Sequence, residues 1–95
     1  MFTKRLREHV TAWWDIDADI DDVTDYLHTF PEDGFSRWLQ DDLRQAIEDH
    51  DLTPTSIGTL TNRRFDSQTD LDDWLRDRWT TWFPGDIFPR YERGS

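Results

Sequence analysis

The chain has 95 residues, which is the size of a single domain. It carries 21 acidic and 11 basic residues, a net charge of −10, and this excess of acid argues against direct binding to nucleic acid or to anionic lipid. The absence of cysteine excludes disulfides and thiolate chemistry, and no apolar run approaches the roughly 18 residues of a membrane span.

Aromatic residues compensate for a low hydrophobic content of 35%. The chain contains six Trp, six Phe and two Tyr, and each of these side chains can bury about 150–250 Å². We therefore expect one folded domain over residues 1–95, with an ordered core at about 3–84 and a C-terminal tail at 85–95. A protein of this kind is expected in the cytoplasm, as a monomer or a homodimer.

Helical periodicity predicts the first two elements. The first helix has a stripe made of Phe2, Leu6, His9, Val10 and Trp13. A second helix is predicted from about residue 19 to residue 30, where Asp residues in the first turn suit the helix dipole and Pro31 ends the helix. Its apolar stripe consists of Ile16, Ile20, Val23, Leu27 and Phe30.

A third helix follows the turn at residues 32–34, with Ser36 as the expected N-cap. Its inward face consists of Phe35, Trp38, Leu39, Leu43, Ala46 and Ile47. Thr53 followed by Pro54 is typical of a helix start, and a short helix is predicted there before a loop at residues 62–68.

The last helix is capped by Thr69 or Asp70 and stopped by Pro84. Its broad apolar stripe consists of Leu71, Trp74, Leu75, Trp79, Trp82 and Phe83. In the tail, Ile87, Phe88 and Tyr91 are expected to cover the edge of the core. The fold class is all-α, as a small bundle of four or five helices.

Two charged residues interrupt these apolar stripes. Asp42 falls within the stripe of the third helix and Arg78 within that of the last helix. Unpaired burial of either charge would be costly. We therefore predict that these two side chains pair with each other across the helix interface, or that one of them faces a partner protein.

The sequence contains only weak motifs for metal binding or catalysis. The run Asp15-Ile16-Asp17-Ala18-Asp19 resembles the start of a calcium loop, but the sixth position is Ile20 instead of Gly and the twelfth is Tyr26 instead of Glu. The three His residues are scattered singly, and no Ser lies in a glycine elbow. The sequence predicts no catalytic residue, no metal site and no cofactor.

The acid is concentrated in one segment. Residues 15–33 contain eight acidic residues and no Lys or Arg. Codon bias or adaptation to salt could account for acidity, but adaptation should spread the acid over every exposed face. A local acidic face steers association with a basic partner. The candidate partner-binding residues are Asp15, Asp17, Asp19, Asp21, Asp22, Asp25, Glu32 and Asp33.

The order of features resembles that of small helical immunity proteins of contact-dependent growth inhibition systems. The resemblance covers about residues 6–83. It lies in Trp13-Trp14, the acidic stretch 15–19, Asp21-Asp22-Val23 with Tyr26-Leu27, Pro31, the helix around Leu39 and Leu43, and Asp73-Trp74-Leu75. It implies a cytoplasmic protein that binds a cognate toxin domain and has no fixed catalytic residues.

Three hypotheses about function follow. The first is a non-enzymatic, immunity- or antitoxin-like protein that covers the active or nucleic-acid-binding surface of a basic toxin. The second is a phage- or plasmid-borne DNA mimic that inhibits a DNA-binding defence protein. The third is a structural or regulatory interaction domain whose acid serves only solubility in salt.

Overall fold

Five helices and no strand are found in the structure, a computed structural model that describes residues 2–89. The expected small all-α bundle is confirmed. The helices are α1 (Lys4–Trp13), α2 (Ile20–Thr29), α3 (Gly34–Glu48), α4 (Pro54–Thr61) and α5 (Gln68–Trp82). Within these residues, no helix has the length and apolar character needed to cross a membrane.

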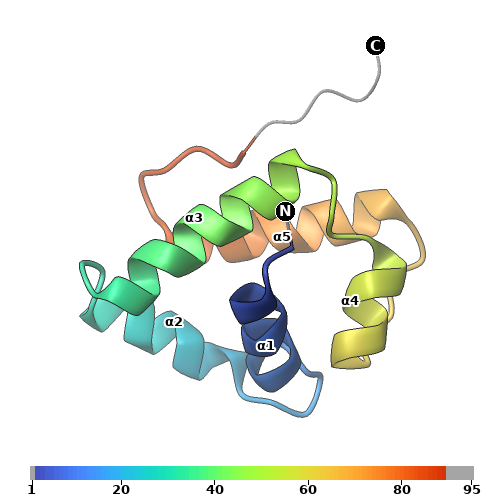
Figure 1. Ribbon diagram of the computed structural model, residues 1–95, viewed down its shortest axis with the longest axis horizontal. Helices are drawn as coiled ribbons and strands as arrows, with labels where there is room; N and C mark the ends of the chain where they lie inside the picture. The colour runs from blue at the N-terminus through green and yellow to red at the C-terminus, as the bar shows by residue number, and fades with distance from the viewer. Residues whose placement is uncertain (1, 90–95) are drawn as a thin grey trace.

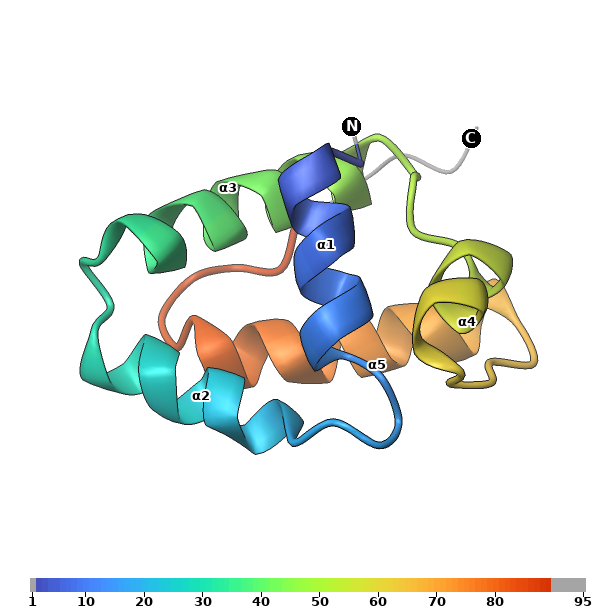
Figure 2. The same ribbon diagram turned by 60° about the horizontal axis from the view of Figure 1, so that its bottom comes forward.

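The two long helices define the body of the molecule. α3 and α5 run along its long direction, and α1 crosses in front of both in the view of Figure 2. α1 packs against α3 and α4, whereas α2 packs against α5. α2 and α4 lie at opposite ends of the molecule (Figure 1), so the outer side of α2 is not covered by α4.

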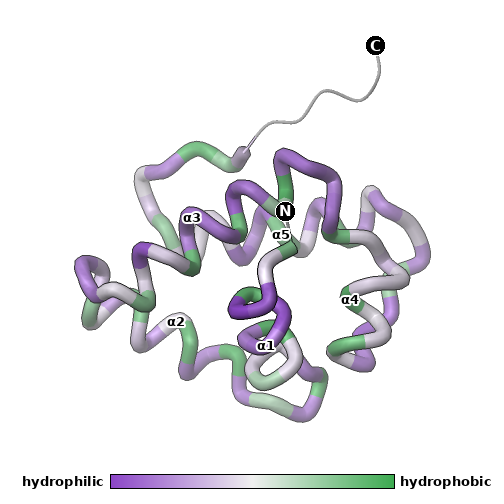
Figure 3. The backbone as a smooth tube through the Cα atoms, in the orientation of Figure 1, coloured by the Kyte–Doolittle hydropathy of each residue, from purple (hydrophilic) through white to green (hydrophobic). Residues whose placement is uncertain are grey.

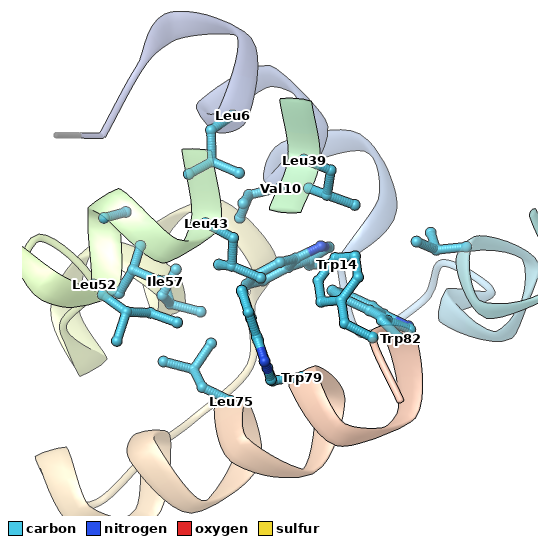
Figure 4. Close-up of a cluster of buried hydrophobic side chains, with 14 of the residues drawn as sticks. Leu6, Val10, Trp14, Leu39, Leu43, Leu52, Ile57, Leu75, Trp79 and Trp82 are labelled. Atoms are coloured by element: carbon cyan, nitrogen blue, oxygen red, sulfur yellow. The ribbon is translucent and has the colours of Figure 1, made fainter. Parts of the chain in front are cut away.

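The core is built around tryptophan. Trp14, Trp79 and Trp82 are its largest fully buried side chains. Trp14 lies in the middle of the labelled side chains in Figure 4, and its ring centroid is 5.6 Å from that of Trp82 and 5.4 Å from that of Trp74. Aromatic burial therefore supplies much of the apolar area that this polar chain needs.

Side-chain caps fix where the helices begin. Thr53 and Ser56 form a capping box at the start of α4, as the Thr-Pro signal predicts. Two predicted caps are wrong. Asp33 caps α3, while Ser36 lies inside that helix and donates to the Phe30 carbonyl at 2.7 Å. Ser67 caps α5, two or three residues before the predicted position.

The predicted ion pair between Asp42 and Arg78 is not formed. Asp42 instead accepts two hydrogen bonds from Arg5, at 2.6 and 2.9 Å, and one from the Thr3 hydroxyl at 2.8 Å. The Arg5 hydrogen bond lowers the pKa of Asp42. Arg78 pairs with its neighbour Asp77 at 2.9 Å. The arginine that satisfies Asp42 comes from the polar side of α1.

The residues after α5 only partly cover the core. The Phe88 ring lies 6.4 Å from that of Trp79, as expected of a covering residue. Ile87 is 81% exposed, so its predicted packing is wrong. Tyr91 lies outside the described residues.

Candidate protein-binding surface

The outer side of α2 is acidic because the helix is amphipathic. Val23 and Leu27 are buried against the body of the molecule. Asp21, Asp22 and Asp25 fall on the opposite side of the helix and are exposed. The hydropathy colouring in Figure 3 shows the corresponding alternation of hydrophilic and hydrophobic residues along α2.

The loop before α2 divides its acid between structural and exposed positions. Asp15 is half-buried and accepts from the Asp17 backbone N–H at 2.9 Å and from the Asn62 amide at 3.0 Å. Asp19 caps α2 by accepting from the Asp21 backbone N–H. Asp17 is exposed. Two of the predicted site residues in this loop therefore also hold local structure.

The last two predicted residues are engaged within the fold. Glu32 forms an ion pair with Arg37 at 2.7 Å. Asp33 caps α3 and accepts from the Tyr26 hydroxyl at 2.7 Å. The hydrogen bond from Tyr26 lowers the pKa of Asp33, and the same bond raises the pKa of Tyr26.

Within the described residues, the Asp side chains of this region are not neutralised by Lys or Arg. Among residues 2–89, no Lys or Arg forms an ion pair with any Asp of the segment 15–33. Four exposed carboxylates of this region take no part in a helix cap, a loop hydrogen bond or an ion pair within the described residues. We call them the acidic surface; they are those of Asp17, Asp21, Asp22 and Asp25. Their negative potential extends into solvent and is available to a cationic partner.

Exposed apolar side chains share this region, which the sequence patterns did not reveal. Of the five large hydrophobic side chains exposed among the described residues, four fall between residues 13 and 30. Their exposed fractions are 44% for Trp13, 57% for Ile16, 38% for Tyr26 and 52% for Phe30. Apolar groups gathered beside charged ones are typical of protein interfaces.

Three of these side chains were expected inside, and the ends of α2 explain why two of them are not. Trp13 is the last residue of α1, and Trp14 is the member of the pair that is fully buried. Ile16 precedes α2 and donates its backbone N–H to the Thr61 carbonyl at 2.9 Å. Phe30 is the C-cap of α2, with a non-helical φ of −127° and ψ of 60°. A helical wheel extended past the ends of α2 misplaces Ile16 and Phe30, whereas Trp13 is exposed within α1 itself.

A cavity of about 400 Å³ lies where α2, α3 and the residues after α5 meet. Its polar lining is already bonded internally. His28 Nε2 lies 2.6 Å from the Thr81 carbonyl, and Asp86 accepts from both Gln40 and Arg44. The Ser36 hydroxyl donates to a backbone carbonyl. These contacts do not assemble a nucleophile with a base.

The basic residues at positions 4–7 and 63–64 are also engaged within the fold. Arg5 binds Asp42, and Arg64 lies 3.8 Å from Asp66. Arg63 donates its Nε to the Trp14 carbonyl at 2.7 Å. In the part of the chain that the structure describes, no three His, Asp or Glu side chains gather as a metal site would require.

The surface that the geometry singles out is therefore acidic and partly aromatic, on α2 and the loop before it. Comparisons of the chain with protein-family models, with curated proteins and with solved structures found no match.

Proposed function

We propose that this protein is a non-enzymatic binding protein of the immunity or antitoxin kind. It neutralises a basic protein toxin by covering the toxin's active or nucleic-acid-binding surface. The observation that supports this most is the acidic surface, whose carboxylates have no basic partner among residues 2–89 and lie beside exposed apolar side chains.

Electrostatics and apolar contact have separate tasks in such a complex. Unpaired carboxylates steer a basic partner and can raise its association rate by one to three orders of magnitude. Exposed rings supply apolar contact area that keeps the partner bound. A toxin that acts on nucleic acid binds phosphates with Lys and Arg, so carboxylates placed on those residues exclude its substrate.

The exposed rings also distinguish this proposal from DNA mimicry. A duplex presents phosphates at its surface and keeps its bases stacked inside. Tyr26 and Phe30 have no counterpart on such a surface, so a pure mimic gains nothing from exposing them. A dedicated protein interface uses both kinds of group.

The first experiment is affinity capture from the source organism at low and at moderate salt, with mass spectrometry of the bound proteins. Three baits are compared: the wild type, the variant Asp17→Lys/Asp22→Lys/Asp25→Lys, and the control Asp41→Lys/Glu48→Lys/Asp73→Lys. Both variants change the net charge equally, but the control alters exposed acid on α3 and α5.

We expect one basic protein to be retained by the wild type and the control at moderate salt and lost from the first variant. Co-expression with this chain should then relieve the growth defect that the captured protein causes. Association of the purified pair should slow at least ten-fold in the first variant and depend less on salt. Equal loss from both variants, or capture of several DNA-binding proteins that duplex DNA displaces, would contradict the proposal.

A further inference from the structure

Two arginines of the chain are each bound by a carboxylate and an aromatic ring together. Arg5 makes two hydrogen bonds to the Asp42 carboxylate while its Cζ lies 5.0 Å from the centroid of the Trp38 ring. Arg44 pairs with Asp86 while its Cζ lies 5.4 Å from the Trp79 ring. In both places one guanidinium uses a carboxylate at its edge and an aromatic ring at its face, as its planar shape allows.

The same two ingredients occur together on the outer side of α2. Asp22 and Tyr26 are four residues apart on α2, and the C-cap residue Phe30 continues this row through the contact of its ring with that of Tyr26. The Tyr26 and Phe30 rings are neighbours, with centroids 5.1 Å apart. The Asp33 carboxylate reaches this row by accepting the Tyr26 hydroxyl hydrogen bond. Tyr26 thus has Asp22 one helical turn before it and the Asp33 carboxylate at its hydroxyl.

No arginine among residues 2–89 lies over either ring of this row. Five arginines lie over rings within residues 2–89, and their rings are Trp38, Phe2, Trp79, Trp74 and Phe88. Asp22 takes part in no ion pair with a described Lys or Arg, and both rings remain exposed. In the part of the chain that the structure describes, this row therefore has the carboxylate and the rings of the other two sites but no guanidinium.

We infer that the row Asp22–Tyr26–Phe30 is a binding site for arginine side chains of a partner protein. The guanidinium stacks on the exposed rings and donates hydrogen bonds to Asp22. The inference deepens the proposed function, because it names the side chain by which the basic partner is recognised. It also predicts a preference for arginine over lysine, which the charge of the acidic surface alone does not provide.

The preference can be measured on the purified chain without the natural partner. Hexa-arginine and hexa-lysine carry equal charge, so long-range attraction and its screening by salt are the same for both peptides. We expect the wild type to bind hexa-arginine about two- to five-fold more tightly at 20 mM NaCl, as cation–π contact at an exposed site provides. Ring signals of Tyr26 and Phe30 should shift in NMR spectra with hexa-arginine and much less with hexa-lysine.

The variant Phe30→Leu keeps apolar bulk but removes one ring face, and Tyr26→Leu/Phe30→Leu removes both. We expect the arginine preference to fall in the first variant and to vanish in the second, while the Kd for hexa-lysine stays unchanged. Trp13→Leu is the matched control, because it removes an exposed ring that has no carboxylate one turn away in α1. Circular dichroism checks that each variant is folded.

Equal affinities of the two peptides for the wild type would overturn the inference, as would a preference that Trp13→Leu abolishes and Phe30→Leu leaves intact. A wild-type homodimer that Phe30→Leu dissociates would also overturn it, by assigning the rings to a second copy. These results are independent of the capture experiment. Neutralisation of a captured toxin does not require an arginine preference, and the peptides measure that preference whether or not a toxin is captured.

Discussion

The buried His9 side chain combines a titratable group with an aromatic environment. Its ring contacts the rings of Trp14, Phe35 and Trp38, and its Nε2 is buried with no hydrogen-bond partner among residues 2–89. Burial lowers the pKa of the His9 imidazole from 6.5 to about 4. The folded protein therefore holds His9 neutral in a range of pH where the unfolded chain takes up a proton.

Protonation of His9 makes the protein less stable in weak acid. Between pH 6.5 and 4 the unfolded state binds the extra proton, so the free energy of unfolding falls as the pH falls, by a total of about 3 kcal/mol. In His9→Phe this contribution should vanish. Urea unfolding at several pH values tests it, and carboxylates that titrate in both proteins cancel in the comparison. Equal pH dependence of wild type and variant would contradict the burial of a neutral imidazole.

At the scale of the elements, the adjacent Trp13 and Trp14 have opposite environments. Trp13 is 44% exposed, whereas Trp14 is fully buried and joins α1 to α5 through its contacts with Trp74 and Trp82. Trp14→Ala should cost about 3–5 kcal/mol in the free energy of unfolding. Trp13→Ala should change it by less than about 0.5 kcal/mol. Chemical denaturation followed by circular dichroism measures both, and similar costs for the two variants would contradict this orientation of α1.

The helices could be predicted from the sequence because burial imposes a 3.6-residue period and because Thr53-Pro54 and Pro84 mark helix boundaries. The exposed rings of the site could not, because Phe30 lies past the end of α2, where the period stops applying, and Trp13 is exposed although the period places it on the stripe of α1. The partner of Asp42 could not be predicted either. A wheel shows that a charge interrupts a stripe, but Arg5 reaches it from the polar side of another helix.

At the scale of the whole molecule, the effect of the net charge of −10 on stability depends on where the acidic residues lie. Asp25 follows Asp21 by four residues and Asp22 by three on α2, so three like charges are neighbours along one side of the helix. No basic residue of the segment 15–33 offsets them. Asp41 on α3 is in the reverse situation, with Arg37 four residues before it and Arg44 three residues after it.

Removing one charge at each place should therefore have opposite effects at low salt. Asp25→Asn relieves two repulsions and should raise the free energy of unfolding by about 0.5–1 kcal/mol, which for a chain of this size is a rise in Tm of several degrees. Asp41→Asn loses attractions and should leave the Tm unchanged or lower it. Thermal unfolding in 10 mM and 500 mM NaCl separates charge from packing, because a Debye length of a few ångströms removes the gain of Asp25→Asn. Two results would contradict this prediction: a gain in Tm that persists at high salt, or an equal gain in Asp41→Asn. Either would mean that like-charge repulsion is no stronger at the acidic surface than elsewhere on the molecule.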